Sequence, residues 1–404
     1  MSHHNTAFHQ LLQPLSRHDF ERTAREHHVG QKLRSASRWD QFIGIAMSQI
    51  SGRQSLRDIE SSLASQRHKL YHLGAKPIAR STLARLNEQQ PAELYEAIFY
   101  KLLQRCSVRS NAHKFRFKNP LYSLDASTID LSLNIFPWAK IHQSKAGVKL
   151  HTGLNNASLI PEFVALSDGR EGDLIQGRQF TFPAGSIVAF DKGYVDYRWY
   201  GELTKQKVSF VTRLRPKAVY QVQKSNPVRA ETSVEYDQVI ELSSQHAQKQ
   251  GAPTLRLVGY NCPESGKHFR FITNNFKLAA TTIASIYKDR WQVELFFKAL
   301  KQNLKIKAFL GNSKNAVLTQ IWIAMICYLL LSFARHSARQ GWSVQRIMRT
   351  LQVSLFERIP LWALLNPPSL KPECSGLMIP DTQIGGTLAT QEVFNEKTTS
   401  FLYP

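Results

Sequence analysis

The polar residues with the most distinctive spacing lie between positions 287 and 301. Tyr287, Arg290, Glu294, Lys298 and Lys301 follow one another at intervals of three or four residues. Since an α-helix turns by about 100° per residue, this spacing places all five side chains on one face of a predicted helix. A single carboxylate among cations fits an ordinary amphipathic helix, in which Glu294 pairs with its neighbours. It equally fits a face that binds phosphate groups and a metal ion together.

Two aspartates upstream of this helix favour the metal-binding interpretation. Asp125 follows the apolar run LYSL, and Asp191 follows the apolar run SIVAF, so we expect both to project from the ends of strands. A buried carboxylate there is costly unless a cation or hydrogen bonds compensate it. Together with Glu294 the aspartates form an all-oxygen ligand set, which Mg²⁺ and Mn²⁺ prefer. The sequence therefore predicts Asp125, Asp191 and Glu294 as metal ligands and catalytic residues that hold two divalent cations for phosphodiester displacement.

The overall charge indicates what such a site would act on. Lys and Arg number 52 against 30 Asp and Glu, which gives a formal net charge of +22 in 404 residues. A surplus of this size attracts polyanions, so nucleic acid is the leading partner and an anionic membrane surface the second. With 43% hydrophobic residues the chain has enough apolar material for two or three domains.

Cysteine usage and hydropathy favour a protein of the cytoplasm. The four cysteines are widely separated, which supports neither a zinc cluster nor a disulfide framework. The N-terminal residues have no apolar core and do not resemble a signal peptide. Residues 317–334 form an uncharged run about long enough to cross a bilayer. We expect a buried core helix instead, because the run is isolated in a polar chain and contains Gln320, and we expect no membrane partner.

The N-terminal region, from about residue 17 to 115, has a helical pattern. Residues 55–70 and 78–90 read as two short helices. One interpretation is a helix-turn-helix whose DNA-facing residues are Arg80, Ser81, Thr82 and Arg85. The alternative is a small helical bundle with a solvated basic face.

From residue 120 onward the pattern changes to that of an α/β domain. Three successive strands precede a strand, a helix and a strand, which indicates a mixed sheet. Residues 216–280 contain four further strand-like segments with no helix between them, and we interpret them as a β insertion. The expected division is 1–118 (helical, DNA-binding), 119–215 (first part of the catalytic domain), 216–280 (β insertion), 281–340 (final catalytic helices) and 341–404 (C-terminal helix and tail).

Other polar residues are weaker candidates. Lys149 and His151 lie two apart on a predicted strand, so both would point to one side and could approach the metal site. For His151 a hydrogen-bonded structural role is the alternative. Asp173 closes the turn-like sequence SDGREGD, where aspartate normally caps or turns the chain.

The spacing Tyr287-x2-Arg290-x3-Glu294-x6-Lys301 resembles the Y-x2-R-x3-E-x6-K signature of insertion-sequence transposases of the YREK or DDE type, related to insertion sequence four. The segments LDAST, at 124–128, and FDKGY, at 190–194, look like the first two acidic motifs of that family. The resemblance covers roughly residues 120–335.

This resemblance implies a ribonuclease-H-like catalytic domain with a mixed sheet, a β-strand insertion between the second Asp and the Glu, and an N-terminal all-α domain. It implies that Asp125, Asp191 and Glu294 bind the metals, and that Tyr287, Arg290 and Lys301 contact terminal DNA phosphates. Lys298 shares their face and is assigned to the same phosphates. Trp291 is a candidate for stacking on an unpaired base, with packing at the helix edge as the alternative.

We therefore expect a DNA transposase that cuts at transposon ends and transfers the 3′-hydroxyl strand into target DNA. Its expected partners are double-stranded DNA, as terminal inverted repeats and target, and a second copy of the chain in a synaptic complex at the bacterial nucleoid. The alternatives are a ribonuclease-H-like nuclease without strand transfer, and an inactive DNA-binding protein derived from a transposase. Three acids facing phosphate argue against the last, because they would repel DNA unless metals were bound.

Overall fold

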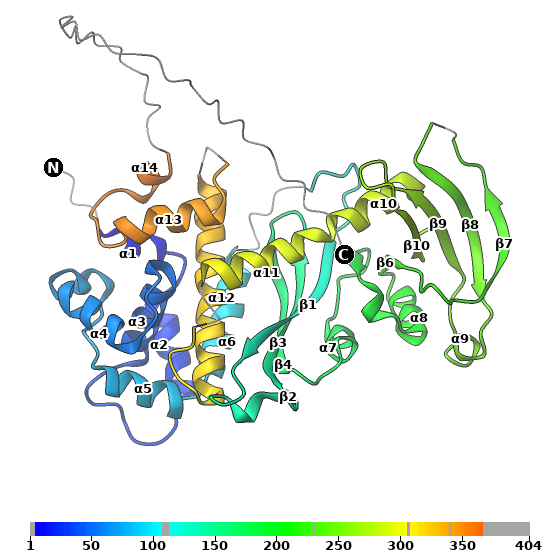
Figure 1. The fold of residues 1–404 in the computed structure, drawn as a ribbon. Helices are drawn as coiled ribbons and strands as arrows, with labels where there is room; N and C mark the ends of the chain where they lie inside the picture. Colours follow the sequence, from blue (N-terminus) through cyan, green and yellow to red (C-terminus); the bar gives the residue numbers. More distant parts are fainter. Residues whose placement is uncertain (1–4, 107–112, 230, 305–307, 339–340, 367–404) are drawn as a thin grey trace, which may run out of the picture.

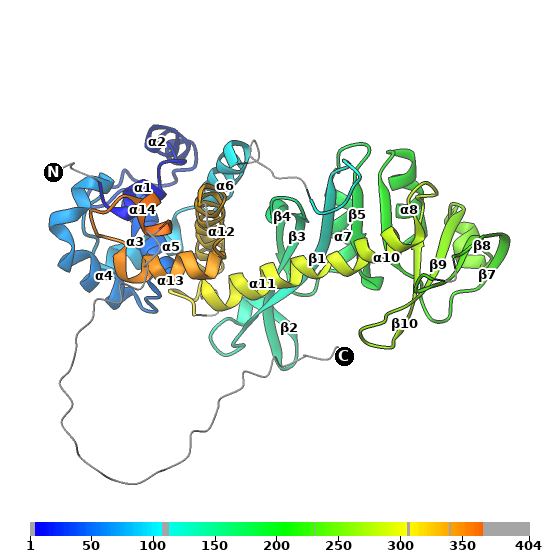
Figure 2. The ribbon, with the colours of Figure 1, turned by 90° about the horizontal axis from the view of Figure 1, so that it is seen from above.

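The chain forms a helical N-terminal part beside a long mixed sheet, and a pair of helices runs along one face of that sheet (Figures 1 and 2). This computed structural model describes residues 5–106, 113–229, 231–304, 308–338 and 341–366. The end of the predicted C-terminal tail, residues 367–404, lies outside the described residues.

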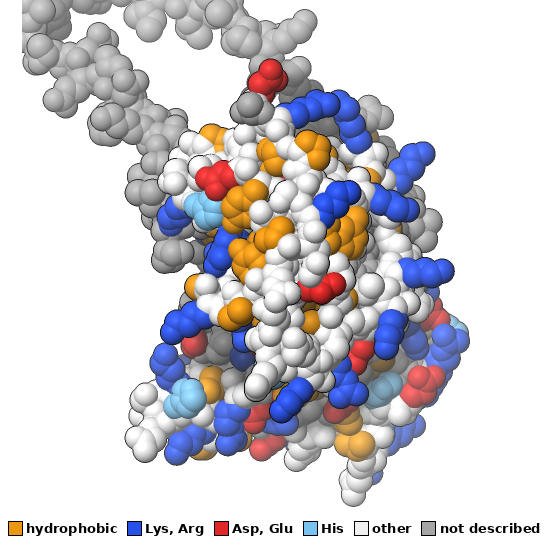
Figure 3. Space-filling view, turned by 90° about the vertical axis from the view of Figure 1, so that its right-hand side faces the viewer, with side chains coloured by type: hydrophobic (Ala, Val, Ile, Leu, Met, Phe, Trp, Pro, Cys, Tyr) orange, Lys and Arg blue, Asp and Glu red, His pale blue; other side chains and the backbone are white. Residues whose placement is uncertain are grey.

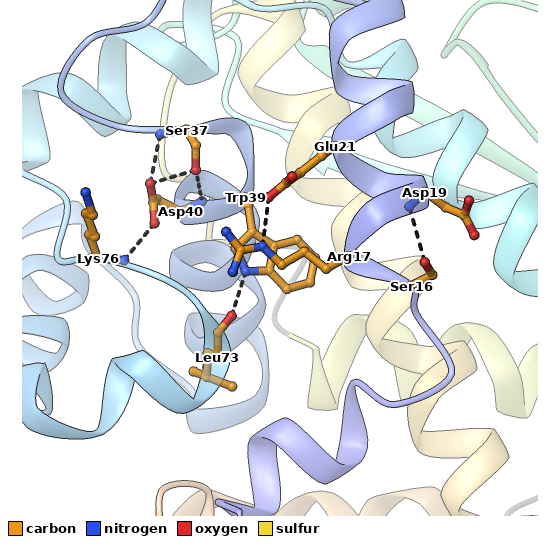
Figure 4. Close-up of polar contacts among 9 residues, drawn as sticks. All are labelled: Ser16, Arg17, Asp19, Glu21, Ser37, Trp39, Asp40, Leu73 and Lys76. Atoms are coloured by element: carbon orange, nitrogen blue, oxygen red, sulfur yellow. Dashed lines mark hydrogen bonds and ion pairs between the residues drawn. The ribbon is translucent and has the colours of Figure 1, made fainter.

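The N-terminal part is built from helices, and the first four of them begin at serine or threonine caps. Ser37 and Asp40 form a capping box at the start of the third helix: each side chain accepts a hydrogen bond from the other residue's backbone N–H. Asp40 also accepts the backbone N–H of Lys76 at 2.7 Å, and the indole of Trp39 donates to the carbonyl of Leu73 (Figure 4). The elements are α1 (Ala7–Leu11), α2 (Arg17–Glu26), α3 (Arg38–Ser51), α4 (Leu56–Ser65), η1 (Arg67–Leu73), α5 (Arg80–Gln89) and α6 (Glu93–Cys106).

The apolar run at 317–334 lies within α12 (Lys314–Ser337), which packs against α3, α5, α6 and α13. By length and composition, Lys314–Arg335 is a candidate membrane span, yet 89% of its most apolar window is buried inside the protein. Gln320 is satisfied within the fold, since its carbonyl accepts the backbone N–H of Leu310 and its amide donates to the carbonyl of Ala308. The expectation of a buried core helix is therefore confirmed.

The strands between Leu121 and Arg213 that form the first part of the sheet are ordered β4-β3-β1-β5-β6. β3 is antiparallel to both of its neighbours, whereas β1, β5 and β6 run parallel. This is the strand order of a ribonuclease-H-like fold, as expected. The bounds are β1 (Leu121–Leu131), β2 (Lys140–His142), β3 (Lys145–Asn155), β4 (Ile160–Asp168), β5 (Ile187–Phe190) and β6 (Ser209–Arg213).

The strands predicted between β6 and the final helices extend the same sheet beyond β6, in the order β10-β9-β8-β7. The expectation of no helix among them is wrong, because the short helix α9 lies between β8 and β9, begins at the cap Ser244 and buries Ala247. The bounds are β7 (Tyr220–Asn226), β8 (Val234–Leu242), α9 (Gln245–Lys249), β9 (Leu255–Asn261) and β10 (His268–Thr273).

Helices cover both faces of the sheet. Apolar side chains of α7 (Asp173–Gln179), α8 (Tyr197–Lys205) and α9 pack on the face that carries Leu124 and Phe190. α10 (Ala280–Asp289) packs on the other face, which carries Leu121 and Ala189, and α11 (Trp291–Asn303) continues along β1 and β3. The last two helices of the described residues are α13 (Val344–Ser354) and α14 (Leu361–Leu365).

The predicted single helix at 287–306 is two helices that meet at Arg290, and residues 305–307 lie outside the described part. At the junction the backbone N–H of Arg290 donates to the carbonyl of Tyr287, and that of Val293 donates to the carbonyl of Arg290. These three-residue hydrogen bonds replace the regular four-residue pattern and tighten the turn. Glu294 nevertheless stays one turn after Arg290, and the two side chains form an ion pair.

The cap at Asp40 gives a testable prediction for stability. Replacing Asp40 with Ala removes acceptors for the backbone N–H groups of Ser37 and Lys76. The free energy of unfolding should fall by about 2 kcal/mol, measured by urea denaturation. Asp58→Ala in the exposed first turn of α4 is the matched control and should cost less than about 0.5 kcal/mol. Equal losses in the two variants would contradict a special role for Asp40.

Candidate active site

Asp125 and Asp191 are brought together by the parallel pairing of β1 with β5. The register pairs Leu121 with Ile187 and Leu124 with Phe190, so the aspartates occupy the next position on each chain. Both follow the alternation that points toward α10 and α11. The expectation that Asp125 ends its strand is wrong, because β1 continues to Leu131 as a hairpin partner of β3. β5 is the strand that ends at this level, with Phe190, so its pairing with β1 stops directly before Asp125.

Glu294 joins the aspartates from α11 through Arg290. The guanidinium of Arg290 donates from Nη1 to Oδ2 of Asp125 at 3.0 Å and from Nη2 to Oε1 of Glu294 at 2.6 Å. Its side chain is only 12% exposed, so these ion pairs are weakly screened by water. Arg290 therefore lies between two predicted metal ligands and offsets part of their charge.

The carboxylates influence one another's protonation. Burial is the main reason that the pKa of Asp125 rises from 3.8 to about 6; Arg290 opposes this increase, and the nearby charges of Asp191 and Glu294 add to it. Burial acts to lower the pKa of Arg290, but Asp125, Tyr287 and Glu294 outweigh it and raise that pKa. Like charges gathered in a partly dry site favour a bound cation.

The donor set suits hard divalent ions, although its present arrangement is that of an ion-pair network. Within the described residues, no three His, Cys, Asp or Glu side chains are grouped closely enough to hold a metal ion. Arg290 separates Asp125 from Glu294, and Oδ1 of Asp191 accepts the backbone N–H of Gly193 at 2.7 Å. Asp125, Asp191 and Glu294 nevertheless supply the oxygen ligands that divalent ions prefer. The raised pKa of Asp125 reflects a site in which a further positive charge would be favourable.

The predicted phosphate-binding residues are distributed along the same two helices. Tyr287 is packed against the ring of Phe271 at 4.9 Å, with the guanidinium groups of Arg213 and Arg290 near its own ring. Lys301 donates from Nζ to the carbonyl of Thr128 at 2.7 Å, further along β1 from Asp125. Two further side chains on α11, those of Lys298 and Trp291, are exposed.

Buried donors without partners surround this region. The hydroxyl of Tyr287 and the Nε atoms of Arg213 and Arg290 make no hydrogen bond within the described part of the chain. Thr152, paired across the sheet with Asp125, has a buried hydroxyl in the same condition. Buried polar groups are normally satisfied, so a cluster of unsatisfied donors beside the carboxylates is suited to oxygen acceptors such as those of phosphate.

Comparison with known proteins decides the family. The family described as "Transposase DDE domain" matches residues 116–330, more than half of the chain. The chain belongs to the DDE transposase family. A second family, described as a domain of unknown function (DUF4372), matches residues 3–76.

Named relatives agree with this assignment. The transposase is 31% identical over 297 residues to y4zB of Sinorhizobium fredii, a protein named as a putative transposase; the match covers 72% of this chain and 81% of that protein. It is 30% identical over 253 residues to a protein of Geobacillus stearothermophilus with the name "Probable transposase for insertion sequence element IS5377"; the match covers 62% of this chain and 66% of that protein. The solved structure of the piggyBac transposase synaptic complex with hairpin DNA gives a TM-score of 0.43 at 12% identity, over 90% of this chain and 81% of that one. The predicted resemblance to insertion-sequence transposases is confirmed, and as a member of the family the chain is a DNA-binding enzyme.

His151 and Lys149, the two weaker candidates for the metal site of the transposase, lie on the opposite face of the sheet. His151 pairs across the sheet with Ala126, so it points away from Asp125, and its ring shares a hydrogen bond with Ser167 at 2.8 Å. Burial lowers its pKa to about 4, so it is neutral near pH 7. Lys149 pairs with Asp173 at 2.8 Å, where Asp173 starts α7 rather than a turn. For His151 the structural interpretation therefore holds.

Sequence reasoning missed one buried carboxylate at the site of the transposase. Asp289 lies directly before Arg290, with only 7% of its side chain exposed. Its position on the buried side of the helix pattern was the available signal, although the charged residues around it gave an equally good solvent-exposed interpretation.

The raised pKa of Asp125 predicts a pH-dependent gain in stability on removing its charge. The unfolded carboxyl ionises near 3.8 and the folded one near 6, so ionisation costs the folded transposase stability as pH rises through this window. In EDTA at pH 8, Asp125→Asn should raise the free energy of unfolding by about 1–3 kcal/mol, because one pKa unit corresponds to about 1.4 kcal/mol.

This gain should shrink below pH 6 and vanish below about pH 4, as urea titrations at several pH values would reveal. Asp130→Asn on the exposed part of β1 is the control and should change little. A variant that is less stable than the parent at pH 8 would contradict the proposed cost of the Asp125 charge.

Proposed function

We propose that this transposase cleaves phosphodiester bonds at the ends of its insertion sequence and joins the freed 3′-hydroxyl strand to target DNA. Asp125, Asp191 and Glu294 would hold two Mg²⁺ or Mn²⁺ ions. When bound, such ions activate the attacking oxygen and stabilise the leaving oxygen. The observation that carries the proposal is that Arg290, with 12% of its side chain exposed, pairs with both Asp125 of β1 and Glu294 of α11. Asp191 directly follows Phe190 of β5, the partner of Leu124, and therefore lies level with Asp125.

Arg290 has two roles in this proposal. In the structure it neutralises Asp125 and Glu294. Its Nε atom is buried without a partner, so the same side chain retains capacity for a phosphate oxygen. Tyr287, whose hydroxyl lies beside it, would donate to the same phosphate, and Lys301 and Lys298 would hold phosphates further along α11. Trp291, exposed at the start of α11, is the candidate for stacking on an unpaired base.

The rest of the molecule would contribute a long basic surface to DNA binding. Seen from the end formed by the insertion, Lys and Arg side chains are spread around the face (Figure 3). In the N-terminal part, Arg80, Ser81 and Arg85 are exposed on α5, and Thr82 is partly exposed. Residues 66–79 separate α4 from α5, far more than the short turn of a helix-turn-helix. We therefore assign DNA contact to a basic face of the helical bundle.

The division into a helical DNA-binding domain (1–118), a catalytic domain (119–215 and 281–340), a β insertion (216–280) and a C-terminal region (341–404) belongs to this proposal. So does a synaptic homodimer, because two transposon ends must be joined in one event. The site of action would be the bacterial nucleoid in the cytoplasm.

A cleavage and strand-transfer assay tests the function. The purified protein is mixed with labelled DNA that carries the element's own ends and with a target plasmid, in Mg²⁺ or in EDTA. We expect Mg²⁺-dependent nicking at the ends, followed by joining to the plasmid. Glu294→Gln, which keeps the shape and removes the charge, should lower the cleavage rate by roughly 10³-fold or more, as expected when a major electrostatic contribution is lost.

The other outcomes separate the alternatives. Cutting without end preference or joining would identify a nuclease. Tight binding with no cutting by either protein would identify an inactive DNA-binding relative and refute the proposed chemistry. Asp130→Asn, an exposed carboxylate on β1, should cut like the parent.

The salt dependence of DNA binding tests the phosphate contacts on α11. Each lysine that neutralises a phosphate contributes about 0.9 to the slope of log K against log salt concentration. Lys298→Gln should therefore lower the slope by about that amount, measured by anisotropy with labelled end DNA. Lys249→Gln on α9, which lies on the opposite face of the sheet, is the matched control. Equal slopes for Lys298→Gln and the parent would remove Lys298 from the phosphate contacts.

A further inference from the structure

A buried polar network joins β1 to the junction between α10 and α11. Asp289, the last residue of α10, accepts a hydrogen bond from Lys114 at 2.6 Å and another from the amide of Asn156 at 3.1 Å. The same amide of Asn156 lies 3.3 Å from the main-chain carbonyl of Asp289. The side-chain carbonyl oxygen of Asn156 accepts a hydrogen bond from the hydroxyl of Ser123 at 2.8 Å.

The two ends of this network lie beside the candidate catalytic residues. Ser123 is fully buried, two positions before Asp125 on β1, and faces the same side of the sheet. Asp289 directly precedes Arg290 in the sequence, and Glu294 follows Arg290 one turn later on α11. The network therefore connects β1, which carries Asp125, to the end of α10, the helix that directly precedes the one carrying Glu294.

The junction is a place where such a connection can act, because the regular helical hydrogen bonding is interrupted at Arg290. Arg290 lies between the last residue of α10 and the first residue of α11. Its backbone N–H donates to the carbonyl of Tyr287, and its own carbonyl accepts the N–H of Val293. The side chain of Asn156 holds both the carboxylate and the carbonyl of Asp289, which fixes the end of α10 in position and in rotation. A buried carboxylate kept at this cost is better explained by geometry than by packing, since an apolar residue would pack without desolvation.

We propose that Asp289 and Asn156 form a positioning pair that sets the α10–α11 junction so that Arg290 and Glu294 face Asp125. Neither residue of the pair touches the reacting atoms, and both act through the helix junction. The inference rests on the proposed function in one respect, namely that these carboxylates carry out the chemistry.

A charge-swap experiment tests the pair. Asn156→Asp places a second carboxylate against Asp289, and the two groups repel. Adding Asp289→Asn restores one amide and one carboxylate with their positions exchanged, so the new amide can donate to the new carboxylate, which still accepts the hydroxyl of Ser123. We expect Asn156→Asp to lower the cleavage rate at saturating DNA by about 10–100-fold, with DNA affinity unchanged, as for other residues that orient metal ligands. The double variant should recover to within about threefold of Asp289→Asn alone.

A matched control places the same substitution away from the junction. Asn261 donates to Glu235 on the surface of the insertion, so Asn261→Asp also brings two carboxylates together. It should leave the cleavage rate unchanged. Recovery of thermal stability in the double variant without recovery of the cleavage rate would overturn the positioning role and leave only packing.

A second measurement does not depend on catalysis. Hydrogen exchange of peptides spanning residues 287–294 should speed up in Asn156→Asp and return toward the parent rate in the double variant. If exchange follows this pattern and even the parent protein does not cut DNA, the pair sets the junction and the proposed function fails. Unchanged exchange in Asn156→Asp would overturn the positioning pair, whatever the activity.

Discussion

The contact of one guanidinium with two carboxylates is the interaction on which the site depends. Parallel pairing of β1 and β5 places Asp125 and Asp191 at the same level of the sheet, and like charges so close together disfavour folding. Arg290 relieves part of this cost by pairing with Asp125 and Glu294 at once. Arg290 does so from the junction between α10 and α11. The position of the helix break and the arrangement of the charges are therefore linked.

The β insertion contributes to this arrangement from a distance. Its strands continue the sheet beyond β6, and α10 packs across β5, β6, β8, β9 and β10. A buried ion pair between Arg256 and Asp237 reinforces the contact, because Arg256 also donates to the carbonyl of Leu278, just before α10. The insertion thus anchors the start of the helix pair whose other half carries Glu294. An element separate from the carboxylates in sequence therefore helps to set their geometry.

Local patterns made much of this arrangement predictable. Strand alternation located β1 and β5, and helical spacing put Tyr287, Arg290 and Glu294 on one face. What could not be predicted depends on contacts between distant segments. Arg290 meets Asp125 across 165 residues and Asn156 meets Asp289 across 133, so the helix break and the positioning pair leave no local signal. The glycine-containing sequence that leads into α7 predicted a turn. In the structure a helix begins at Asp173, and the ring of Tyr194 packs closely over Gly177 within it.

The unsatisfied donors support the proposal that the site takes a phosphate group. Tyr287 and the Nε atoms of Arg213 and Arg290 are buried donors without partners, whereas the nearby carboxylates repel anions. In the proposed complex, the oxygens of a phosphodiester would accept from these donors, and divalent cations held by the acids would offset the repulsion. Under the proposed function, acids and donors that are each unfavourable alone would therefore become mutually consistent when a DNA strand and metal ions bind.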